Sequence, residues 1–412
     1  MVFLFFKNTV LFFVLTMLSC GNVSNSDAKR SAPEKSVADT AKTRLPVVGA
    51  NQTENYLTLL KGRRVGIVAN QTSVIFKSDH TFTHLVDSLL ALQIDIKKVF
   101  APEHGFRGNA DAGELIKDGT DIKTGLPLIS LYGNNKKPTH SQLEDIDILV
   151  FDIQDVGARF YTYISTLHYV MEACAEQGIP VLILDRPNPN GHYIDGPILE
   201  KEHQSFVGMH PVPVVHGMTI AEYAQMINGE GWLEKNITCN LHLISVKNYT
   251  HSTSYSLPIK PSPNLPNDQA INLYPSLCFF EGTTVNAGRG TEMQFQVFGS
   301  PFLNAKVFTF RYTPKPNEGA KHPKHEGKLC YGTNLTPHEK LDAIRLNWLI
   351  MAYNNTDAKD TFFNSFFVKL AGTRTLQEQI EAGFTEEEIK ATWQADLATY
   401  KKIREKYRLY PD

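Results

Sequence analysis

The chain has 412 residues, of which 42% are hydrophobic and 20% charged, so it holds enough apolar material for a large core and two domains. Its 41 basic and 43 acidic side chains leave a net charge of −2. This near balance provides no electrostatic footprint for nucleic acid or for an anionic membrane surface. Function must therefore be sought in local groups of residues rather than in overall charge.

The N-terminal residues carry the pattern of an export signal. Lys7 precedes an apolar run at residues 10–18 that is too short to span a bilayer, and Ser19 and Cys20 follow it. The Leu-Ser-Cys-Gly sequence resembles the end of a bacterial lipoprotein signal, in which the cysteine is lipidated. We therefore predict a signal peptide at residues 1–20, a lipid anchor on Cys20 and an exported lipoprotein of the cell envelope (periplasm or outer membrane). The alternatives are an ordinary secretory signal and a poor membrane anchor.

Residues 21–46 are rich in Ser, Ala, Lys, Thr and Asp and have few large apolar side chains, which predicts a disordered tether. Disulfides are possible in an exported protein, but the remaining cysteines are sparse, irregularly spaced and form no Cys-x-x-Cys pair. They are Cys174, Cys239, Cys278 and Cys330. We expect the hydrophobic core, rather than sulfur, to hold the fold.

Five short apolar runs are predicted to be buried strands, at residues 65–69, 96–101, 127–131, 148–151 and 180–184. Helical patterns lie between them, at residues 81–92 and after the fourth run, where Gly178 ends the helix. This alternation indicates a parallel sheet covered on both faces. Because it becomes unclear near residue 190, too early for an eightfold barrel, it favours an open, doubly wound α/β sheet.

Three further helices are predicted, at residues 220–228, 338–354 and 385–407. Thr219 and Glu222 form a capping box for the first, which explains Glu222 but leaves His216, just before it, without a structural role. The Pro-rich loop at residues 260–266 is a candidate boundary. We therefore predict a catalytic domain at residues 47–260 and a smaller domain at residues 261–412 that completes the cleft.

Each predicted strand ends in polar or ring-bearing side chains. These are Asn70, then Glu103 and His104, then Tyr132, then Asp152, Gln154 and Asp155, and finally Asp185, Arg186 and Asn188. The carboxyl ends of parallel strands lie along one edge of a sheet, where ligands bind, so these side chains predict a shared polar cleft. The second group is the most suggestive, because Pro102 stops the strand and Glu103, His104 and Arg107 follow among glycines.

No Gly-x-Gly-x-x-Gly sequence follows a predicted strand, and the chain contains no Walker-type loop. The sheet therefore lacks the phosphate cradle of a dinucleotide or ATP enzyme, and we predict no cofactor. The chain also lacks the Gly-x-Ser-x-Gly elbow of a serine hydrolase.

The side chains expected at the cleft suit a sugar that carries a carboxylate. Tyr161 and Tyr163 offer rings for stacking, amides can hold hydroxyl groups, and arginines can bind a carboxylate in bidentate fashion. Glycoside hydrolysis usually needs two carboxyl groups. Glu103 is the candidate general acid, and Asp152 or Asp155 is the candidate second carboxyl. An ion pair between Asp155 and Arg159, at i,i+4 spacing, is the structural alternative.

Two other classes of protein stay open at this stage. A zinc deacetylase or amidase could use Glu103, His104, Asp152 and His216 as ligands, although no His-x-x-x-His or His-Glu-x-x-His spacing supports it. A non-catalytic, glycan-binding lipoprotein would use the same rings and arginines.

Several strings of the sequence resemble the exo-β-N-acetylmuramidase family of the NamZ type, formerly a family of unknown function. They lie, in family order, at residues 65–72 (VGIVANQT), 101–108 (APEHGFRG), 151–163 (FDIQDVGARFYTY), 184–189 (LDRPNP), 216–219 (HGMT), 261–266 (PSPNLP) and 288–291 (GRGT). The resemblance runs from about residue 63 to the C-terminus. It implies a Rossmann-like N-terminal domain and a smaller α+β C-terminal domain, with the active site between them.

The resemblance also implies a reaction: removal of terminal N-acetylmuramic acid from the non-reducing end of peptidoglycan fragments, in cell-wall turnover. It makes Glu103 the key catalytic residue, and the lactyl carboxylate of muramic acid accounts for Arg159, Arg186 and Arg289. Glu292 and Met293 follow the GRGT string where the family pattern continues with a different sequence, so the resemblance defines the role of Glu292 less closely than those of the other residues. The residues predicted to contact the substrate are Asn70, His104, Arg107, Gln154, Arg159, Tyr161, Tyr163, Arg186, Asn188, His216, Asn264, Arg289 and Glu292.

Overall fold

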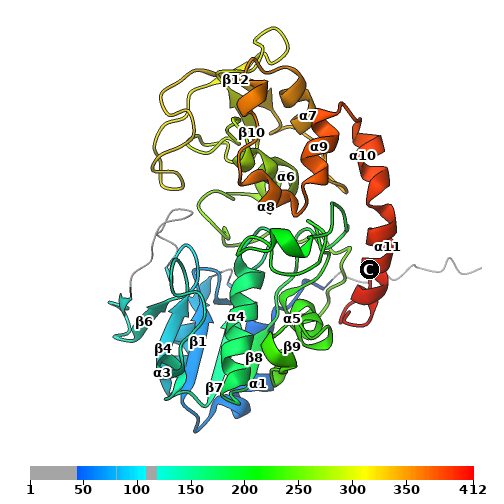
Figure 1. Cartoon of the computed structure of the whole chain (residues 1–412). Coiled ribbons are helices and arrows are strands. Elements are labelled where there is room, and N and C mark those ends of the chain that lie inside the picture. The colour runs from blue at the N-terminus through cyan, green and yellow to red at the C-terminus, as the bar shows by residue number, and fades with distance from the viewer. Residues whose placement is uncertain (1–43, 80, 108–117) are drawn as a thin grey trace, which may run out of the picture. The chain divides into compact units, whose positions relative to one another are not determined.

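The computed structural model describes residues 44–79, 81–107 and 118–412, which belong to one compact unit, Arg44–Asp412 (Figure 1). The predicted signal peptide, the lipidated Cys20 and most of the tether lie outside the described residues. Within the described residues, none of the helices combines the length and the apolar character that a membrane crossing requires.

A seven-stranded sheet forms the centre of the first part of the chain. Its order is β5-β6-β4-β1-β7-β8-β9, and every pairing is parallel except that of β5 with β6. The strands are β1 (Val65–Ala69), β4 (Ile96–Ala101), β5 (Gly119–Thr120), β6 (Pro127–Ser130), β7 (Ile148–Asp152), β8 (Val181–Leu184) and β9 (Leu241–Ile244). From β1 the chain first adds strands on one side of the sheet (β4, then β6) and later on the other side (β7, β8, then β9). A Rossmann fold has the same arrangement, and its ligands bind at the carboxyl ends of the strands.

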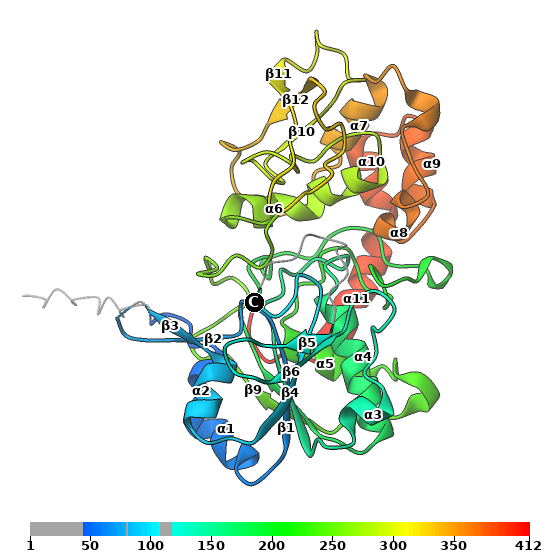
Figure 2. The same cartoon turned by 90° about the vertical axis from the view of Figure 1, so that its left-hand side faces the viewer.

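Helices cover both faces of this sheet, which confirms the predicted doubly wound α/β class. One core packs α1 (Thr53–Leu60) and α2 (Leu85–Ala91) on one face. A second core packs α4 (Tyr163–Glu176) and α5 (Ile220–Gly229) on the other, near the short α3 (His140–Leu143). Figure 2 shows the sheet between these two layers. The strands alternate their side chains between the cores: Ile67 enters the first and Val68 the second.

The second part of the chain contains a small antiparallel sheet and helices, as the fold prediction expects. The sheet has the order β10-β12-β11, with β10 (Val297–Ser300), β11 (Phe310–Tyr312) and β12 (Cys330–Asn334). The helices are α6 (Asp268–Leu277), α7 (Asn347–Asn354), α8 (Phe367–Ala371), α9 (Thr375–Glu381), α10 (Glu386–Thr392) and α11 (Gln394–Glu405). Its core is continuous with the α4 face of the large sheet. The predicted boundary near residue 260 stays a prediction.

Some predicted helices are shorter than expected. The helix at residues 81–92 begins only at Leu85, because residues 82–84 form β3 (Phe82–His84), which pairs with β2 (Val74–Phe76). The helix at residues 338–354 is confined to α7, since the backbone N–H groups of Leu341 and Ile344 donate to side chains of other segments. The helix at residues 385–407 is interrupted at Trp393. The predicted capping box of α5 is present.

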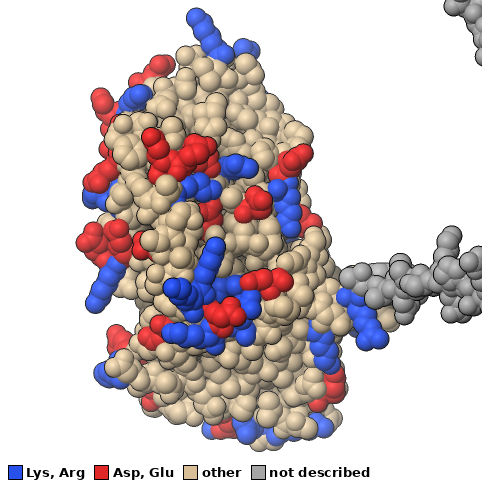
Figure 3. All heavy atoms as spheres, turned by 90° about the vertical axis from the view of Figure 1, so that its right-hand side faces the viewer, with Lys and Arg blue, Asp and Glu red and all other residues tan. Residues whose placement is uncertain are grey.

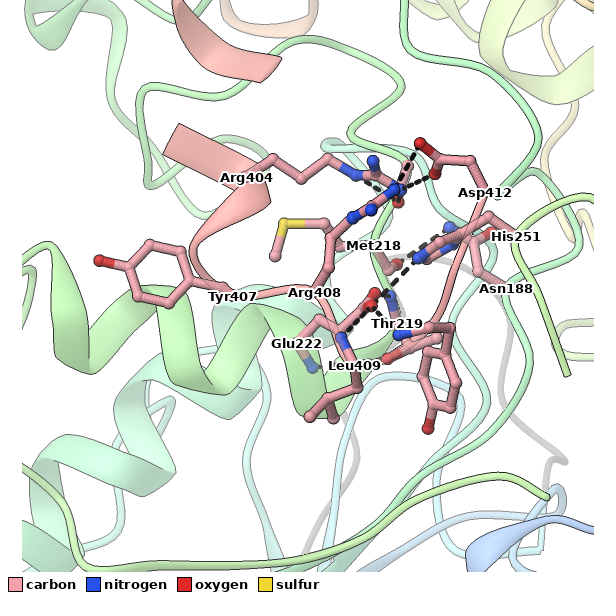
Figure 4. A network of polar contacts seen from close by, with 12 residues as sticks. Asn188, Met218, Thr219, Glu222, His251, Arg404, Tyr407, Arg408, Leu409 and Asp412 are labelled. Atoms are coloured by element: carbon pink, nitrogen blue, oxygen red, sulfur yellow. Dashed lines mark hydrogen bonds and ion pairs between the residues drawn. The ribbon is translucent and has the colours of Figure 1, made fainter. Parts of the chain in front are cut away.

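The end of the chain returns to the first part of the molecule, where α11 runs down beside α5 (Figure 1). Figure 3 shows Lys and Arg side chains gathered on this face, with carboxylates among them. At the end of α11, Arg404 donates to the carbonyl of Gly217 at 2.7 and 2.9 Å and pairs with Asp412 at 3.0 Å. Glu222 accepts from Leu409 N–H at 2.8 Å and contacts His251 at 3.0 Å (Figure 4). The C-terminal residues therefore fasten the second part of the chain to α5.

Candidate active site

A cavity of about 520 Å³ lies beyond the carboxyl ends of β4 and β6, against α6 and the 3₁₀ helix that follows it. Its wall combines aromatic and aliphatic side chains with polar and charged ones, as ligand sites do. The polar members include Glu103, His104, Tyr132, Lys136, Thr162, Ser262, Asn264, Glu281 and Arg289. Of the predicted site residues, this cavity therefore brings together Glu103, His104, Tyr161, Asn264 and Arg289.

A tight turn after β4 places Glu103 in the wall. Pro102 cannot continue the strand's hydrogen bonding, and Gly105 N–H donates back to the Pro102 carbonyl at 3.0 Å. The third turn residue, His104, has φ +70°, in the left-handed region that favours glycine or asparagine. A histidine in this conformation costs on the order of 1 kcal/mol, and such strain often marks a functional position. Here the strained residue is buried and lines the cavity.

Two neighbours fix the half-buried Glu103 carboxylate. The hydroxyl of Thr162, the residue before α4, donates to its Oε2 at 2.7 Å. Burial and the charge of Glu103, to which Tyr132 is also hydrogen-bonded, raise the pKa of Tyr132. The tyrosine therefore stays a neutral hydrogen-bond donor. Both contacts leave the carboxyl group facing the cavity in a defined orientation.

Glu281 is a second carboxylate in the same wall, and the sequence interpretation did not assign it to the site. It lies in the 3₁₀ helix Cys278–Gly282, and Arg289 Nη1 lies 3.4 Å from its Oε2. Arg289 Nη2 also donates to the Gly319 carbonyl at 3.2 Å. Behind them, burial lowers the pKa of Lys324 while the charge of Glu281 opposes the shift. The signal in the sequence is weak, because Glu281 ends an aromatic run that the core explains equally well.

Aromatic rings form the floor of the cavity. Tyr274 meets Tyr161 edge to face at 5.9 Å between ring centroids and Phe295 at 4.9 Å. The Tyr161 hydroxyl donates to the Pro261 carbonyl at 3.0 Å, which ties the Pro-rich loop to the start of α4. Rings fixed in this way offer the flat apolar surface on which a sugar ring can stack.

Most of the other predicted site residues lie beneath this wall, in what we call the buried polar frame. Each is at most 5% exposed and lies outside the cavity wall. The frame consists of Asn70, Asp152, Gln154, Asp155, Arg159, Tyr163, Arg186, Asn188 and His216. Gln154 donates to the carbonyls of Asp155 and Pro187, and Asn188 donates to that of Met218. These side chains hold loops in place and do not line the cavity.

Asp152, one of the two predicted second carboxylates, is fully buried in an ion pair with Arg186. The two guanidinium contacts measure 2.6 and 2.9 Å, and Arg186 also donates to the Val74 carbonyl at 3.0 Å. Burial raises the pKa of Asp152 and the charge of Arg186 opposes the rise. The pair therefore joins β7, β8 and β2 below the cavity.

Asp155 and Arg159 do not pair with each other as the structural alternative proposed. Arg159 donates instead to four backbone carbonyls, at 2.7 to 3.0 Å, two of them at the end of α8. Burial lowers the pKa of Arg159 to about 9 and raises that of Asp155 to about 7. Asp155 accepts from Gly157 N–H and lies 3.8 Å from His216, whose pKa burial lowers to about 3.

Two predicted contacts lie outside both the cavity wall and the frame. Arg107 pairs with Asp121 at 2.8 Å and stacks on the Phe106 ring at 4.3 Å. Glu292 is exposed, in the loop beyond Arg289. The proposed zinc ligands also separate: Glu103 and His104 line the cavity, whereas Asp152 and His216 are in the frame. Among the described residues, the groups that could hold a metal ion are Glu200–Glu202–His203 and Glu172–Glu176–Glu234, neither of which lines the cavity.

Comparisons with known proteins cover nearly the whole of the described chain. The family models described as exo-beta-N-acetylmuramidase NamZ, N-terminal and C-terminal, match residues 65–269 and 272–410. The peptidoglycan beta-N-acetylmuramidase NamZ of Bacillus subtilis is 36% identical over 434 residues, which span 98% of this chain and 100% of that protein. Two crystal structures of DUF1343 family proteins from Bacteroides fragilis are also similar. One has a TM-score of 0.82 and 46% sequence identity, and the match covers 90% of this chain and 100% of that one. The other has a TM-score of 0.74 and 27% sequence identity, and the match covers 89% of this chain and 99% of that one.

Proposed function

The chain belongs to the NamZ family of exo-β-N-acetylmuramidases, and from this premise we propose that it is a glycoside hydrolase that removes terminal N-acetylmuramic acid from peptidoglycan fragments. The observation that carries the proposal is that Glu103 and Arg289 line one cavity with an aromatic floor. A carboxylic acid, a guanidinium and stacked rings are the groups that a sugar with a lactyl carboxylate requires.

In the proposed reaction, Glu103 in its protonated form donates its proton to the glycosidic oxygen as the bond to the anomeric carbon breaks. Thr162 and Tyr132 hold its carboxyl group in place. Glu281, the other carboxylate of the wall, stabilises the positive charge that develops at the anomeric carbon. A water molecule then attacks the anomeric carbon and supplies the hydroxyl group of free N-acetylmuramic acid, while its other proton passes to solvent, from which Glu103 regains the proton it donated.

Arg289 is the proposed receptor for the lactyl carboxylate. Arg159 and Arg186 were predicted to share this role, but their guanidinium groups are occupied within the frame, by four carbonyls and by Asp152. Arg289 keeps 21% of its side-chain surface exposed and faces the cavity. A ligand carboxylate can therefore reach this guanidinium without breaking a buried ion pair.

The cellular setting is proposed from the sequence alone. We keep the prediction that residues 1–20 direct export and that Cys20 carries a lipid, which would place the enzyme in the cell envelope. There it would act on muramic-acid-containing saccharides released during peptidoglycan turnover. Labelling of the whole chain with a radioactive fatty acid, with and without Cys20→Ala, tests the anchor.

The decisive test of function is release of free N-acetylmuramic acid from a muramyl disaccharide and from its chromogenic aryl analogue. We expect Glu103→Gln to lower kcat on the disaccharide by about 10²- to 10⁴-fold, because the amide cannot donate the required proton. Glu144→Gln, at an exposed glutamate next to α3, is the matched control. Equal rates for wild type and Glu103→Gln would contradict the assignment, and turnover abolished by a chelator would favour the metal alternative.

A further inference from the structure

A second groove, of about 370 Å³, adjoins the active-site cavity. The two share Lys136 and Phe206 in their walls. Away from this shared edge, Tyr169, His210 and Trp232 line the groove. The Trp232 indole stacks on the His210 ring, with 4.5 Å between the centroids. Nothing in the proposed reaction uses this groove, although it opens from the same wall that carries Glu103.

A tight turn forms the divide between the cavity and the groove. Ser205 and Gly208 exchange two backbone hydrogen bonds, at 2.9 and 3.0 Å, so that Phe206 and Val207 stand at the tip. On the cavity side, the Phe206 ring meets the Tyr132 ring edge to face, with 6.2 Å between the ring centroids. On the groove side it stacks on the Tyr169 ring, with 6.3 Å between the centroids. Because Tyr132 is hydrogen-bonded to Glu103, a row of rings leads from the catalytic carboxyl into the groove.

Helix α4 sets the distance along this row. Thr162, directly before the helix, touches Glu103, and Tyr169 lies seven residues further on. Seven residues advance about 10 Å along a helix axis. A ligand that reaches from Glu103 to Tyr169 is therefore longer than one sugar ring, and its first ring on this side lies at Tyr132 and Phe206.

Arg289 lines the cavity but not the groove, and Tyr169 lines the groove but not the cavity. Arg289 and Glu281 belong to the second part of the chain, whereas Lys136, Phe206 and Tyr169 belong to the loops and helix of the first. In an exo-acting enzyme the terminal sugar lies on one side of the proton donor and the leaving group on the other. With the lactyl carboxylate at Arg289, the leaving group extends toward Phe206.

We propose that this groove binds the distal sugar rings of the leaving group, beyond the first ring after the scissile bond. The inference rests on the proposed muramidase function. Tyr169 and Trp232, which lie beyond the shared edge, are each half-buried, which leaves ring surface available for stacking on sugar. The Lys136 ammonium lies 4.9 Å above the Phe206 ring at the edge that the groove shares with the cavity, where it adds a positive charge for a carboxylate on the ring that follows the first.

The test compares three substrates: the chromogenic aryl glycoside, the muramyl disaccharide, and a muramyl glycan with three rings in its leaving group. For the whole chain with Tyr169→Ala, we expect kcat/KM on the long glycan to fall about five- to tenfold through a higher KM. Rates on the aryl glycoside and the disaccharide should stay within about twofold of wild type, because neither reaches Tyr169.

Tyr353→Ala is the matched control. Tyr353 is also a half-buried helical tyrosine that stacks on a phenylalanine, Phe363, at 5.5 Å, but it lines neither the cavity nor the groove. It should leave all three substrates unaffected. Equal losses on all three substrates for Tyr169→Ala, or no loss on any, would overturn the subsite. Absence of turnover of every substrate by the wild-type protein would instead overturn the proposed function and the subsite with it.

Discussion

In the buried polar frame Arg186 places two nitrogens on Asp152 at 2.6 and 2.9 Å, whereas in the cavity wall Arg289 holds Glu281 at 3.4 Å and keeps 21% of its side-chain surface exposed. Both pairs join an arginine to a carboxylate, but the access of a ligand to the guanidinium group differs. A fully buried pair can exchange its partner only at a large desolvation cost. A partly exposed pair can open toward a ligand carboxylate, so water access separates structural from functional arginines in this molecule.

The same contrast applies to the carboxylates. Asp152 ends β7, Asp155 follows it, and both are buried. Glu103, in the turn after β4, and Glu281, in the 3₁₀ helix Cys278–Gly282, line the cavity instead. Substitutions in the frame should therefore change the free energy of unfolding and leave the KM of the remaining folded enzyme unchanged. Substitutions in the wall should change kcat or KM and leave the free energy of unfolding nearly unchanged. Four variants, in order of decreasing expected effect, can break or sharpen this distinction.

Arg186→Met should cause the largest loss. It leaves the buried Asp152 carboxylate without its cation, which typically destabilises a protein by about 3–5 kcal/mol. Chemical denaturation of the variant measures this loss. Arg64→Met is the control, because Arg64 makes a similar two-nitrogen contact with Asp147 at an exposed site and should cost far less. A variant of normal stability with a greatly reduced kcat would instead place this ion pair in the catalytic site.

Asp155→Asn should change how stability depends on pH. In the folded protein, burial raises the pKa of Asp155 to about 7 and lowers that of His216 to about 3, so between these values the pair holds one proton. Unfolded, with pKa values of 3.8 and 6.5, the two groups also hold one proton between about pH 4 and 6.5, on the histidine. In the wild-type protein, this pair therefore does not make the free energy of unfolding depend on pH between about pH 4 and 6.5.

In the Asp155→Asn variant only His216 titrates. Below pH 6.5 the unfolded chain then binds one more proton than the folded protein, so stability should fall with falling pH by up to about 1.4 kcal/mol per unit relative to wild type. Denaturation midpoints at pH 4.5, 5.5 and 7.5 measure this difference. Turnover at pH 7.5 should be retained. A parallel pH dependence in both proteins, or lost turnover, would contradict the assignment of Asp155 to the frame.

Arg289→Met should act on binding rather than on stability. A hydrogen bond to a charged group contributes about 2 kcal/mol, so we expect kcat/KM for muramyl substrates to fall about thirtyfold. The preference for muramic acid over N-acetylglucosamine in the terminal position should fall with it. Arg311→Met is the control, since Arg311 lies over the Tyr331 ring outside the cavity. An unchanged preference between the two sugars would exclude Arg289 as the lactyl receptor.

The fold could be predicted from the sequence further than the site could. All five predicted strands are present, because uninterrupted apolar runs such as residues 65–69 have no other stable place than a doubly covered sheet. The strand ends also indicated the edge of the sheet beside which the cavity lies. They did not indicate how deeply each side chain is buried. Asp152 and Arg186 lie beneath long loops, and no local sequence pattern specifies the course of these loops. Glu281 and Phe206 reach the cavity wall from distant segments without periodicity, so their position depends on tertiary packing alone.

His104→Gly should have the smallest effect and separates the two roles that the sequence leaves to this residue. Glycine adopts the left-handed conformation of His104 freely, and the relief of strain roughly offsets the greater entropy of the unfolded chain, so stability should change by less than about 1 kcal/mol. If the imidazole orients Glu103 or the substrate, kcat should fall about tenfold. Gln93→Gly is the matched control, because Gln93 is exposed, has φ +60° and lies in the turn between α2 and β4, outside the cavity. If both variants keep full activity, His104 serves only to form the turn, and Glu103 is the one residue of this turn that takes part in catalysis.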